Sequence, residues 1–146
     1  PLNSVSRTIS LSSDIGEMLD NMRQEQHLFS ATGGVHAAAV FNQNGDLLVV
    51  REDIGRHNAF DKAIGASIEK QFDAKILVLS SRIGWELVAK GVRSGVELII
   101  AVGAISSAAE ALARASGITL VGFAASKNPA IVGDLSRIID KPSSSG

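Results

Sequence analysis

The chemically active side chains of this sequence are concentrated between Arg51 and Lys62. Six of these twelve positions are charged, three of each sign, and a histidine and an asparagine lie among them. The stretch follows an apolar run typical of a buried strand and precedes a segment with helical spacing. The first turn of a helix offers free backbone N–H groups and the positive end of the helix dipole, which together favour an anionic ligand. The alternative is a solvated loop that only caps the helix, but the variety of groups exceeds what capping requires.

Periodicity predicts a helix and a hairpin before this stretch and a second helix after it. After a serine-rich lead-in, the first helix runs from Asp14 to about Gln26. The hairpin pairs 35–41 with 47–51, because an Asn-Gly dipeptide between two apolar runs is a strong hairpin signal. The second helix covers about 57–71. The apolar residues that fall on one face of these two helices are Ile15, Met18, Leu19, Met22, Phe60, Ile64 and Ile68.

The second half of the chain alternates short apolar runs with helical segments. Strands are predicted at 76–79, 97–102 and 118–123, and helices at 85–93 and 107–115, each followed by a glycine where a helix C-cap belongs. Alternation with short links implies parallel pairing and right-handed crossovers. The predicted fold is therefore α/β, a three-layer αβα protein with a five-stranded mixed sheet. Its first two strands form an antiparallel hairpin and the rest are parallel.

Ligands of open sheets of this kind bind at the carboxyl ends of the parallel strands. Four segments are expected to meet there, namely 51–58, 80–86, 103–107 and 123–128. Each is polar and follows an apolar strand. The sequence therefore predicts a ligand cleft for a polar, anionic molecule at this edge of the sheet.

Two pairs of residues in these segments have both a binding and a structural interpretation. Ser106 and Ser107 would offer hydroxyl and N–H groups to an anion, and helix capping is the alternative. Arg82 and Glu86 flank Trp85 in a strand-to-helix loop. They could instead form a surface ion pair, which contributes little to stability.

Composition excludes several classes of protein. The net charge of −1 gives no overall field toward nucleic acid or an anionic membrane. With five Phe, one Trp and no Tyr, the chain is poor in platforms for stacking single-stranded bases. It has no apolar run long enough to span a bilayer. It also has no cysteine, which excludes disulfides and thiolate ligands within the chain and fits a cytosolic origin.

The histidines predict no metal site. Zinc needs three or four convergent ligands, and the three histidines, His27, His36 and His57, lack the spacing of a helical metal pair. The segment around His36 resembles the His-Ala-Glu signature of zinc-dependent deaminases, and the order of elements resembles the cytidine deaminase fold. However, Ala38 stands where the proton-shuttling Glu would be, and the Cys pair is missing. We expect a shared fold without the shared chemistry.

Five motifs in one order resemble the FdhD family, the accessory sulfurtransferases of formate dehydrogenase. The resemblance runs from about Phe29 to Phe123. The longest motif is long and mixed in chemistry, which makes a chance match very rare. The motifs are T-G-G-V-H-A-A-A (32–39), E-D-I-G-R-H-N-A-F-D-K-A-I-G (52–65), S-R-I-G-W-E (81–86), S-S-A-A-E-A-L-A (106–113) and G-I-T-L-V-G-F (117–123).

The resemblance implies a specific function. Proteins of this family carry sulfur from a cysteine desulfurase to the molybdenum cofactor, a bis-molybdopterin guanine dinucleotide, which then enters formate dehydrogenase. They are cytoplasmic homodimers with a cytidine deaminase-like fold. GDP is expected to act as a partial mimic of the cofactor.

This implied cofactor suits the predicted cleft, because helix N-termini and arginines bind phosphates and a carboxylate accepts from guanine. Arg56 is the expected phosphate ligand, with His57 and Asn58 as donors beside it and Asp53 as acceptor for the guanine N–H groups. The expected cofactor-binding residues are Asp53, Arg56, His57, Asn58, Arg82, Ser106, Ser107, Phe123, Ala124, Ala125, Ser126, Lys127 and Asn128.

The sequence departs from the family pattern in several places. A persulfide-bearing C-x-x-C loop precedes the Thr-Gly-Gly stretch in the family, so no catalytic residue is assigned in this cysteine-free chain. We expect a C-terminal domain of a longer protein, because Pro1 begins where that loop would have just ended; loss of the relay is the alternative. Ile105 replaces a Pro, Gly84 replaces a Ser, and Lys127 is the one charge left in a segment that is basic in the family.

The expected organisation has three parts. Residues 1–28 form a lead-in and helix, 29–126 form the cofactor-binding domain, and 127–146 form a tail. A plain guanine-nucleotide-binding or regulatory domain without transfer chemistry is the competing hypothesis. A C-x-x-C upstream in the full-length gene product would distinguish the two.

Overall fold

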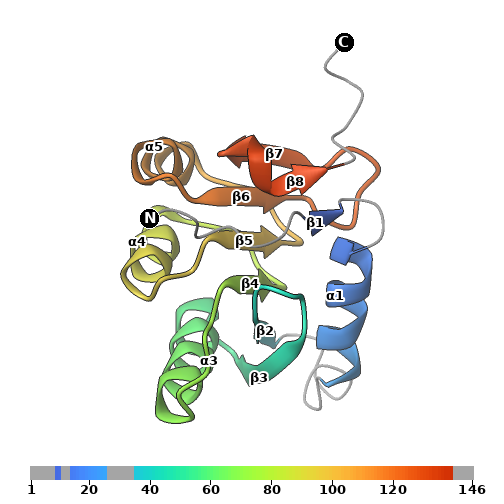
Figure 1. Ribbon diagram of the computed structural model, residues 1–146, viewed down its shortest axis with the longest axis vertical. Helices are drawn as coiled ribbons and strands as arrows, with labels where there is room; N and C mark the ends of the chain where they lie inside the picture. The colour runs from blue at the N-terminus through green and yellow to red at the C-terminus, as the bar shows by residue number, and fades with distance from the viewer. Residues whose placement is uncertain (1–8, 11–13, 26–34, 140–146) are drawn as a thin grey trace.

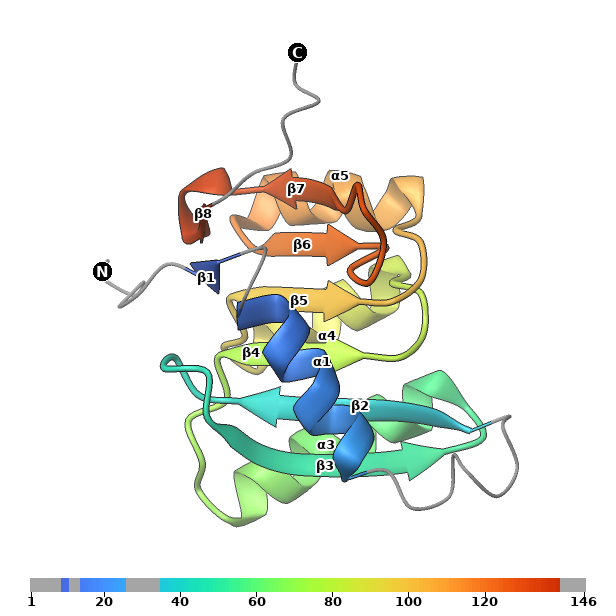
Figure 2. The same ribbon diagram turned by 90° about the vertical axis from the view of Figure 1, so that its right-hand side faces the viewer.

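A six-stranded mixed sheet organises the residues that the computed structural model describes, which are 9–10, 14–25 and 35–139 (Figures 1 and 2). The strand order is β3-β2-β4-β5-β6-β7. β4, β5 and β6 are parallel, whereas the β2–β3, β2–β4 and β6–β7 pairs are antiparallel. The strands are β2 (His36–Phe41), β3 (Leu47–Asp53), β4 (Ile76–Leu79), β5 (Leu98–Ala101), β6 (Thr119–Gly122) and β7 (Ala130–Gly133).

Helices cover both faces of this sheet, which makes a three-layer protein. Figure 1 shows α3, α4 and α5 on one face and α1 on the other. A two-stranded parallel sheet, β1 with β8, lies on the same side as α1 (Figure 2). The bounds are α1 (Asp14–Gln24), α3 (Arg56–Glu69), α4 (Trp85–Arg93), α5 (Ser107–Ser116), β1 (Ile9–Ser10), β8 (Ile138–Ile139) and a 3-10 turn η1 (Leu135–Arg137). Within the described ranges, no helix is long and apolar enough to cross a membrane.

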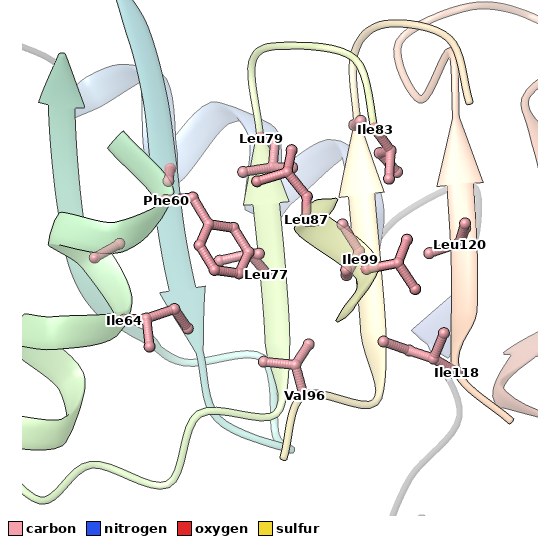
Figure 3. Packing of buried hydrophobic residues seen from close by; sticks show 14 of the residues in the cluster. Phe60, Ile64, Leu77, Leu79, Ile83, Leu87, Val96, Ile99, Ile118 and Leu120 are labelled. Carbon is pink, nitrogen blue, oxygen red and sulfur yellow. The ribbon is translucent and has the colours of Figure 1, made fainter. Parts of the chain in front are cut away.

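The central strands are buried on both faces, as their unbroken apolar sequences require. In β4, Leu77 and Leu79 pack among α3 and α4, while Ile76 and Val78 pack toward α1. Figure 3 shows the first side, where Phe60 of α3 lies over Leu77. Because side chains alternate along a strand, one short run supplies two cores.

α1 covers its face of the sheet with one stripe of side chains. Its four predicted apolar residues are all at most 3% exposed. They pack against the opposite-facing residues of β2, β4 and β5. The predicted amphipathic helix is therefore confirmed, and its buried residues are Ile15, Met18, Leu19 and Met22.

The Asn-Gly hairpin is also confirmed. The Asn42 Oδ1 accepts hydrogen bonds from the N–H groups of Asn44 (2.9 Å) and Asp46 (3.0 Å). Gly45 has a φ of +86°, which a side chain would strain. This turn sets the register that places His36 opposite Asp53 at the far end of the hairpin.

The sheet has one more strand than the five that were predicted. β7 pairs antiparallel with β6, in a segment that the sequence had indicated to be a tail. Its four residues are too few for a clear alternating pattern, and they lie at the sheet edge, where one of them, Ala130, is exposed. The α/β class, the mixed sheet and the three layers are confirmed.

Ile68 was predicted to lie on one face of the helix with Phe60 and Ile64, but it does not share their buried face. Its side chain is 68% exposed, whereas Phe60 and Ile64 are at most 8% exposed. Each four-residue step turns a helix by about 40° more than a full turn, so two steps carry Ile68 about 80° from the buried face. Ala63 and Ser67 face the core instead. The Thr32–Gly34 stretch, His27 and the tail from residue 140 lie outside the described residues.

Candidate functional site

The loops that follow β4, β5 and β6 are hydrogen-bonded to one another at the carboxyl edge of the sheet. The Gly103 N–H donates to the Ser81 carbonyl at 3.1 Å, and the Phe123 N–H donates to the Gly103 carbonyl at 2.9 Å. A further bond runs from the Ile83 N–H to the Ala104 carbonyl, at 2.9 Å. These three predicted segments therefore meet, with the loop after β5 in the middle.

Gly103 allows this close approach. A Cβ atom at this position would lie 3.0 Å from both the Cα and the N of Arg82. That distance is shorter than ordinary van der Waals contact, and the obstructing atoms are backbone. Because Gly103 has no side chain, the Arg82 backbone can pack closely against the loop after β5.

An open pocket of about 400 Å³ lies at this edge. Its lining contains two arginines and one histidine, with serines and a glycine between them. Such a set offers hydrogen-bond donors and positive charge, which suit a phosphate or another polyanion. The lining residues are His36, Arg56, Ser80, Ser81, Arg82, Val102 and Gly103.

Arg56 is the first residue of α3, where the predicted phosphate ligand was placed. The helix N-cap is Gly55, which has no side chain to accept from the first-turn N–H groups. The Arg56 Nε is buried and has no hydrogen-bond partner among the described residues. An unsatisfied buried donor is costly, so this group is suited to an acceptor supplied by a ligand.

Arg82 also lines the pocket. It belongs to a different loop, the one after β4, and is exposed. No hydrogen bond or ion pair joins its side chain to another described residue, so the alternative of an Arg82–Glu86 ion pair is not observed. Arg56 and Arg82 are thus the two predicted residues that the structure brings into one pocket.

Asp53 is engaged within the chain. Its Oδ2 lies 2.7 Å from the Lys62 Nζ, and its Oδ1 accepts from the Gly55 N–H at 3.0 Å and from the Asn58 Nδ2 at 3.4 Å. The Lys62 ammonium, and then the Gly55 N–H, lower the pKa of Asp53 to about 2. The carboxylate therefore holds the β3–α3 turn, and both of its oxygens already accept bonds.

His57 and Asn58 lie in the first turn of α3 but outside the pocket lining. The His57 Nε2 is 3.9 Å from the Glu86 Oε1 of α4, so the starts of these two helices are neighbours. Asn58 is exposed and bonds Asp53. Of these two residues, His57 is therefore the one that faces a second helix.

The two serines at the start of α5 have different structural roles. The Ser106 Oγ accepts from the Ala109 N–H at 3.1 Å, so it caps the helix, as the structural interpretation predicted. Ser107 is the first residue of α5 and is exposed. Neither residue lines the pocket.

The segment from Phe123 to Asn128 forms a turn after β6. Phe123 has a φ of +51° and is 47% exposed, while the Ala124 N–H donates to the Ala101 carbonyl. The Ser126 hydroxyl donates to the Phe123 carbonyl at 2.8 Å, which closes the turn. The remaining residues of this segment are exposed, and they are Ala125, Lys127 and Asn128.

Sequence reasoning did not assign His36 to the ligand cleft. The hairpin register places it opposite Asp53, so counting back from the Asn-Gly turn would have brought it to this edge. Ser80 was within a predicted segment, but its role depends on side-chain direction, because its Oγ accepts from the Ala37 N–H at 2.8 Å. Among the described residues, no group of three or more potential metal ligands is found.

Comparison with known proteins decides the family. The FdhD/NarQ family model matches residues 2–139. The chain belongs to the FdhD/NarQ family. It is 50% identical over 109 residues to the sulfur carrier protein FdhD of Mycobacterium tuberculosis, a match that covers 73% of this chain and 40% of that protein. The FdhD of Sulfolobus acidocaldarius is 45% identical over 107 residues, which cover 71% of this chain and 42% of that protein.

Solved structures support the FdhD fold. A candidate formate dehydrogenase accessory protein from Desulfotalea psychrophila matches with a TM-score of 0.82 and 28% identity, over 92% of this chain and 61% of that one. A guanine deaminase from Nitrosomonas europaea matches with a TM-score of 0.56 and 17% identity, over 80% of this chain and 79% of that one. The second likeness concerns the fold alone and agrees with the expected cytidine deaminase-like architecture. This FdhD/NarQ chain spans about 40% of the length of the curated relatives it matches.

Proposed function

We propose that this chain is the cofactor-binding part of an FdhD-like sulfur carrier. It binds bis-molybdopterin guanine dinucleotide as cargo and supports sulfur transfer to it from a cysteine desulfurase, which formate dehydrogenase needs. The matched relatives are named sulfur carrier proteins, and a structural neighbour is named for formate dehydrogenase. The cytoplasmic location and the homodimer that the family resemblance implies belong to the same proposal.

The observation that carries this proposal is the buried Arg56 Nε, which has no partner in the described part of the chain, at a helix start that no side chain caps. The cargo contains pyrophosphates, whose oxygens are acceptors only. The pocket presents donors from Arg56, Arg82 and His36, and none of the described residues that line it is a carboxylate. The residues present therefore fit an anionic group of this kind.

This chain contributes binding and orientation in the proposed reaction. It contains no cysteine, so the sulfur cannot be held on one of its own thiolates. Arg56 and Arg82 would fix the phosphates at the pocket. The loop after β5, joined to both of its neighbours, would keep that site rigid. The cargo supplies the metal centre that receives the sulfur.

A guanine-nucleotide-binding or regulatory domain without transfer chemistry is the second candidate. The absence of cysteine from this chain favours it. Both candidates need the same pocket, so nucleotide binding does not separate them. A C-x-x-C loop in the full-length gene product would decide for the sulfur carrier.

Calorimetric titration with GDP tests the pocket. Losing a charge-assisted bond costs about 1.5–3 kcal/mol, so Arg56→Ala should weaken GDP binding by at least about tenfold while the melting temperature stays nearly unchanged. Arg93→Ala is the matched control, because Arg93 is an exposed arginine at the end of α4. No GDP binding by the parent chain at millimolar ligand would show that the pocket assignment is wrong. Lower stability with unchanged binding would make Arg56 a structural residue.

A further inference from the structure

Asp53, the carboxylate expected to accept from the guanine base, is already bonded to other residues of the chain. The two donors on the edge of guanine, N1–H and the N2 amino group, match the two oxygens of one free carboxylate. Both Asp53 oxygens already accept bonds, one from Lys62 and the other from Gly55 and Asn58. Recruiting Asp53 to the base would break the bonds that close the β3–α3 turn.

Glu86 is a carboxylate at the same edge with free acceptor capacity. It is the second residue of α4, and its side chain is 51% exposed. Its nearest charged partner among the described residues is His57, at 3.9 Å, which is beyond hydrogen-bond distance. His57 directly follows Arg56 in the first turn of α3, so Glu86 lies near the start of the helix that supplies the pocket arginine.

Trp85 adds a stacking surface next to this carboxylate. It is the first residue of α4 and is 52% exposed, although large apolar side chains are usually covered. The short link from Arg82 through Ile83 and Gly84 joins it to the pocket lining. A half-exposed indole can stack on a purine ring, and such stacking contributes substantially to nucleotide binding.

We propose that Trp85 and Glu86 are the base-recognition residues of the nucleotide site. The indole stacks on the guanine, and the Glu86 carboxylate accepts from N1–H and the N2 amino group. The arginines of the pocket hold the phosphates. This inference rests on the proposed function, because it assumes a guanine nucleotide at this edge. In this proposal Glu86, and not Asp53, recognises the base.

Discrimination between GDP and IDP tests the carboxylate, because IDP lacks only the N2 amino group. The parent chain should bind GDP at least about tenfold more tightly than IDP, since the lost bond involves a charged acceptor. Glu86→Gln should bring that ratio to within about threefold, because a neutral amide offers a single oxygen. Asp53→Asn should leave the ratio unchanged. Glu110→Gln, which removes a carboxylate from the first turn of α5, is the matched control.

Fluorescence tests the stacking, because Trp85 is the only tryptophan in the chain. GDP should quench its emission, and inorganic pyrophosphate at the same occupancy should not. Trp85→Ala should weaken the binding of GDP and of IDP by about tenfold each without changing the ratio of their affinities. Trp85→Phe should restore most of the affinity. Glu86 and Trp85 are both half exposed, so these variants should fold, which melting curves verify.

The outcomes separate the two proposals. If the parent chain binds neither GDP nor pyrophosphate, the proposed function fails and the base site fails with it. If GDP binds but the preference over IDP survives Glu86→Gln, the base site is wrong while the proposed function stands. Loss of the preference in Asp53→Asn alone would return recognition to Asp53.

Discussion

The Lys62 ammonium lies 2.7 Å from the Asp53 carboxylate, across the turn between the edge strand β3 and the helix α3. The same carboxylate accepts from the Gly55 N–H, so one side chain links the strand end, the helix N-cap and the second turn of the helix. Arg56 lies between these points. The position of the pocket arginine therefore depends on this ion pair.

Replacing Asp53 with Asn should destabilise the protein at neutral pH. The Lys62 and Gly55 bonds hold the pKa of Asp53 at about 2, below the value of about 3.9 for an unfolded chain. Stability that comes from a lowered pKa is complete above about pH 5 and is lost as the pH falls from about 4 toward 2. The difference in melting temperature between parent and variant should therefore shrink across pH 7, 4 and 2. Asp20→Asn, at an exposed position of α1, is the control, and a difference that stays constant with pH would contradict this assignment.

Replacing Gly133 with Ala should destabilise the protein more than replacing Gly95. Both glycines have positive φ, +96° and +84°, which costs a side chain about 1–2 kcal/mol. At Gly95 the added Cβ would find open space, but at Gly133 it would collide with the carbonyl oxygen of Ile118. Urea unfolding should give about 1–2 kcal/mol for Gly95→Ala and a larger loss for Gly133→Ala. Equal losses would mean that β7 does not press against β6 as described.

Replacing Thr119 with Val should remove a buried link between β6 and the segment after β7. The fully buried Thr119 hydroxyl donates to the Asp134 carbonyl at 2.6 Å and accepts from the Arg137 guanidinium at 3.0 Å. The isosteric variant removes both bonds, although the Arg137 Nη1 still donates to the Gly117 carbonyl at 2.7 Å, so the free energy of unfolding should fall by about 1–3 kcal/mol. Ser116→Ala, at an exposed helical hydroxyl, should change it by less than about 0.5 kcal/mol. A Thr119→Val variant as stable as the control would show that these bonds contribute nothing.

The edge strand β3 predicts a homodimer. It has seven residues and pairs with β2 on one side, and no other strand of the described residues pairs with its outer side. Exposed strand edges are usually paired or covered, so a second copy of the chain is the expected cover. Light scattering at micromolar concentration should give twice the chain mass of 15.2 kDa. A mass of one chain under these conditions would count against the dimer.

The expectation of no zinc stays a prediction. Ala38 stands where the deaminases have their glutamate, and its side chain is fully buried. Elemental analysis of the purified chain should show less than one zinc per protein. A stoichiometric amount would require a ligand set that the sequence does not indicate.

The fold was largely predictable because its signals are local. The Asn42–Asp46 turn fixes the hairpin, and the spacing of four apolar residues fixes the buried face of α1. α4 was predicted with its observed bounds, Trp85–Arg93. β7 was missed because a four-residue edge strand has too little pattern, and Ile68 was misplaced because helical rotation accumulates over two turns.

The site was predictable only at the level of segments. Charge after a buried strand was enough to place Arg56 at a helix start beside the carboxyl ends of the strands. His36 and Ser80 line the pocket because of the hairpin register and the direction of their side chains. Both depend on pairing between strands and not on the local sequence. Asp53 was read as a free acceptor because its partner, Lys62, reaches it only once α3 has formed.

The pairing of β1 with β8 has a consequence for the order in which the chain acquires its structure. Ile9 is aligned with Ile138, so this small sheet joins segments from near opposite ends of the described residues. It cannot form during synthesis until Ile139 has been made, whereas the β2–β3 hairpin needs only its own residues. Long-range contacts of this kind close late because the intervening chain must be ordered first. We therefore expect the β1–β8 pairing to be the last part of the fold to form. It lies beside α1, on the face of the main sheet opposite α3, α4 and α5 (Figures 1 and 2).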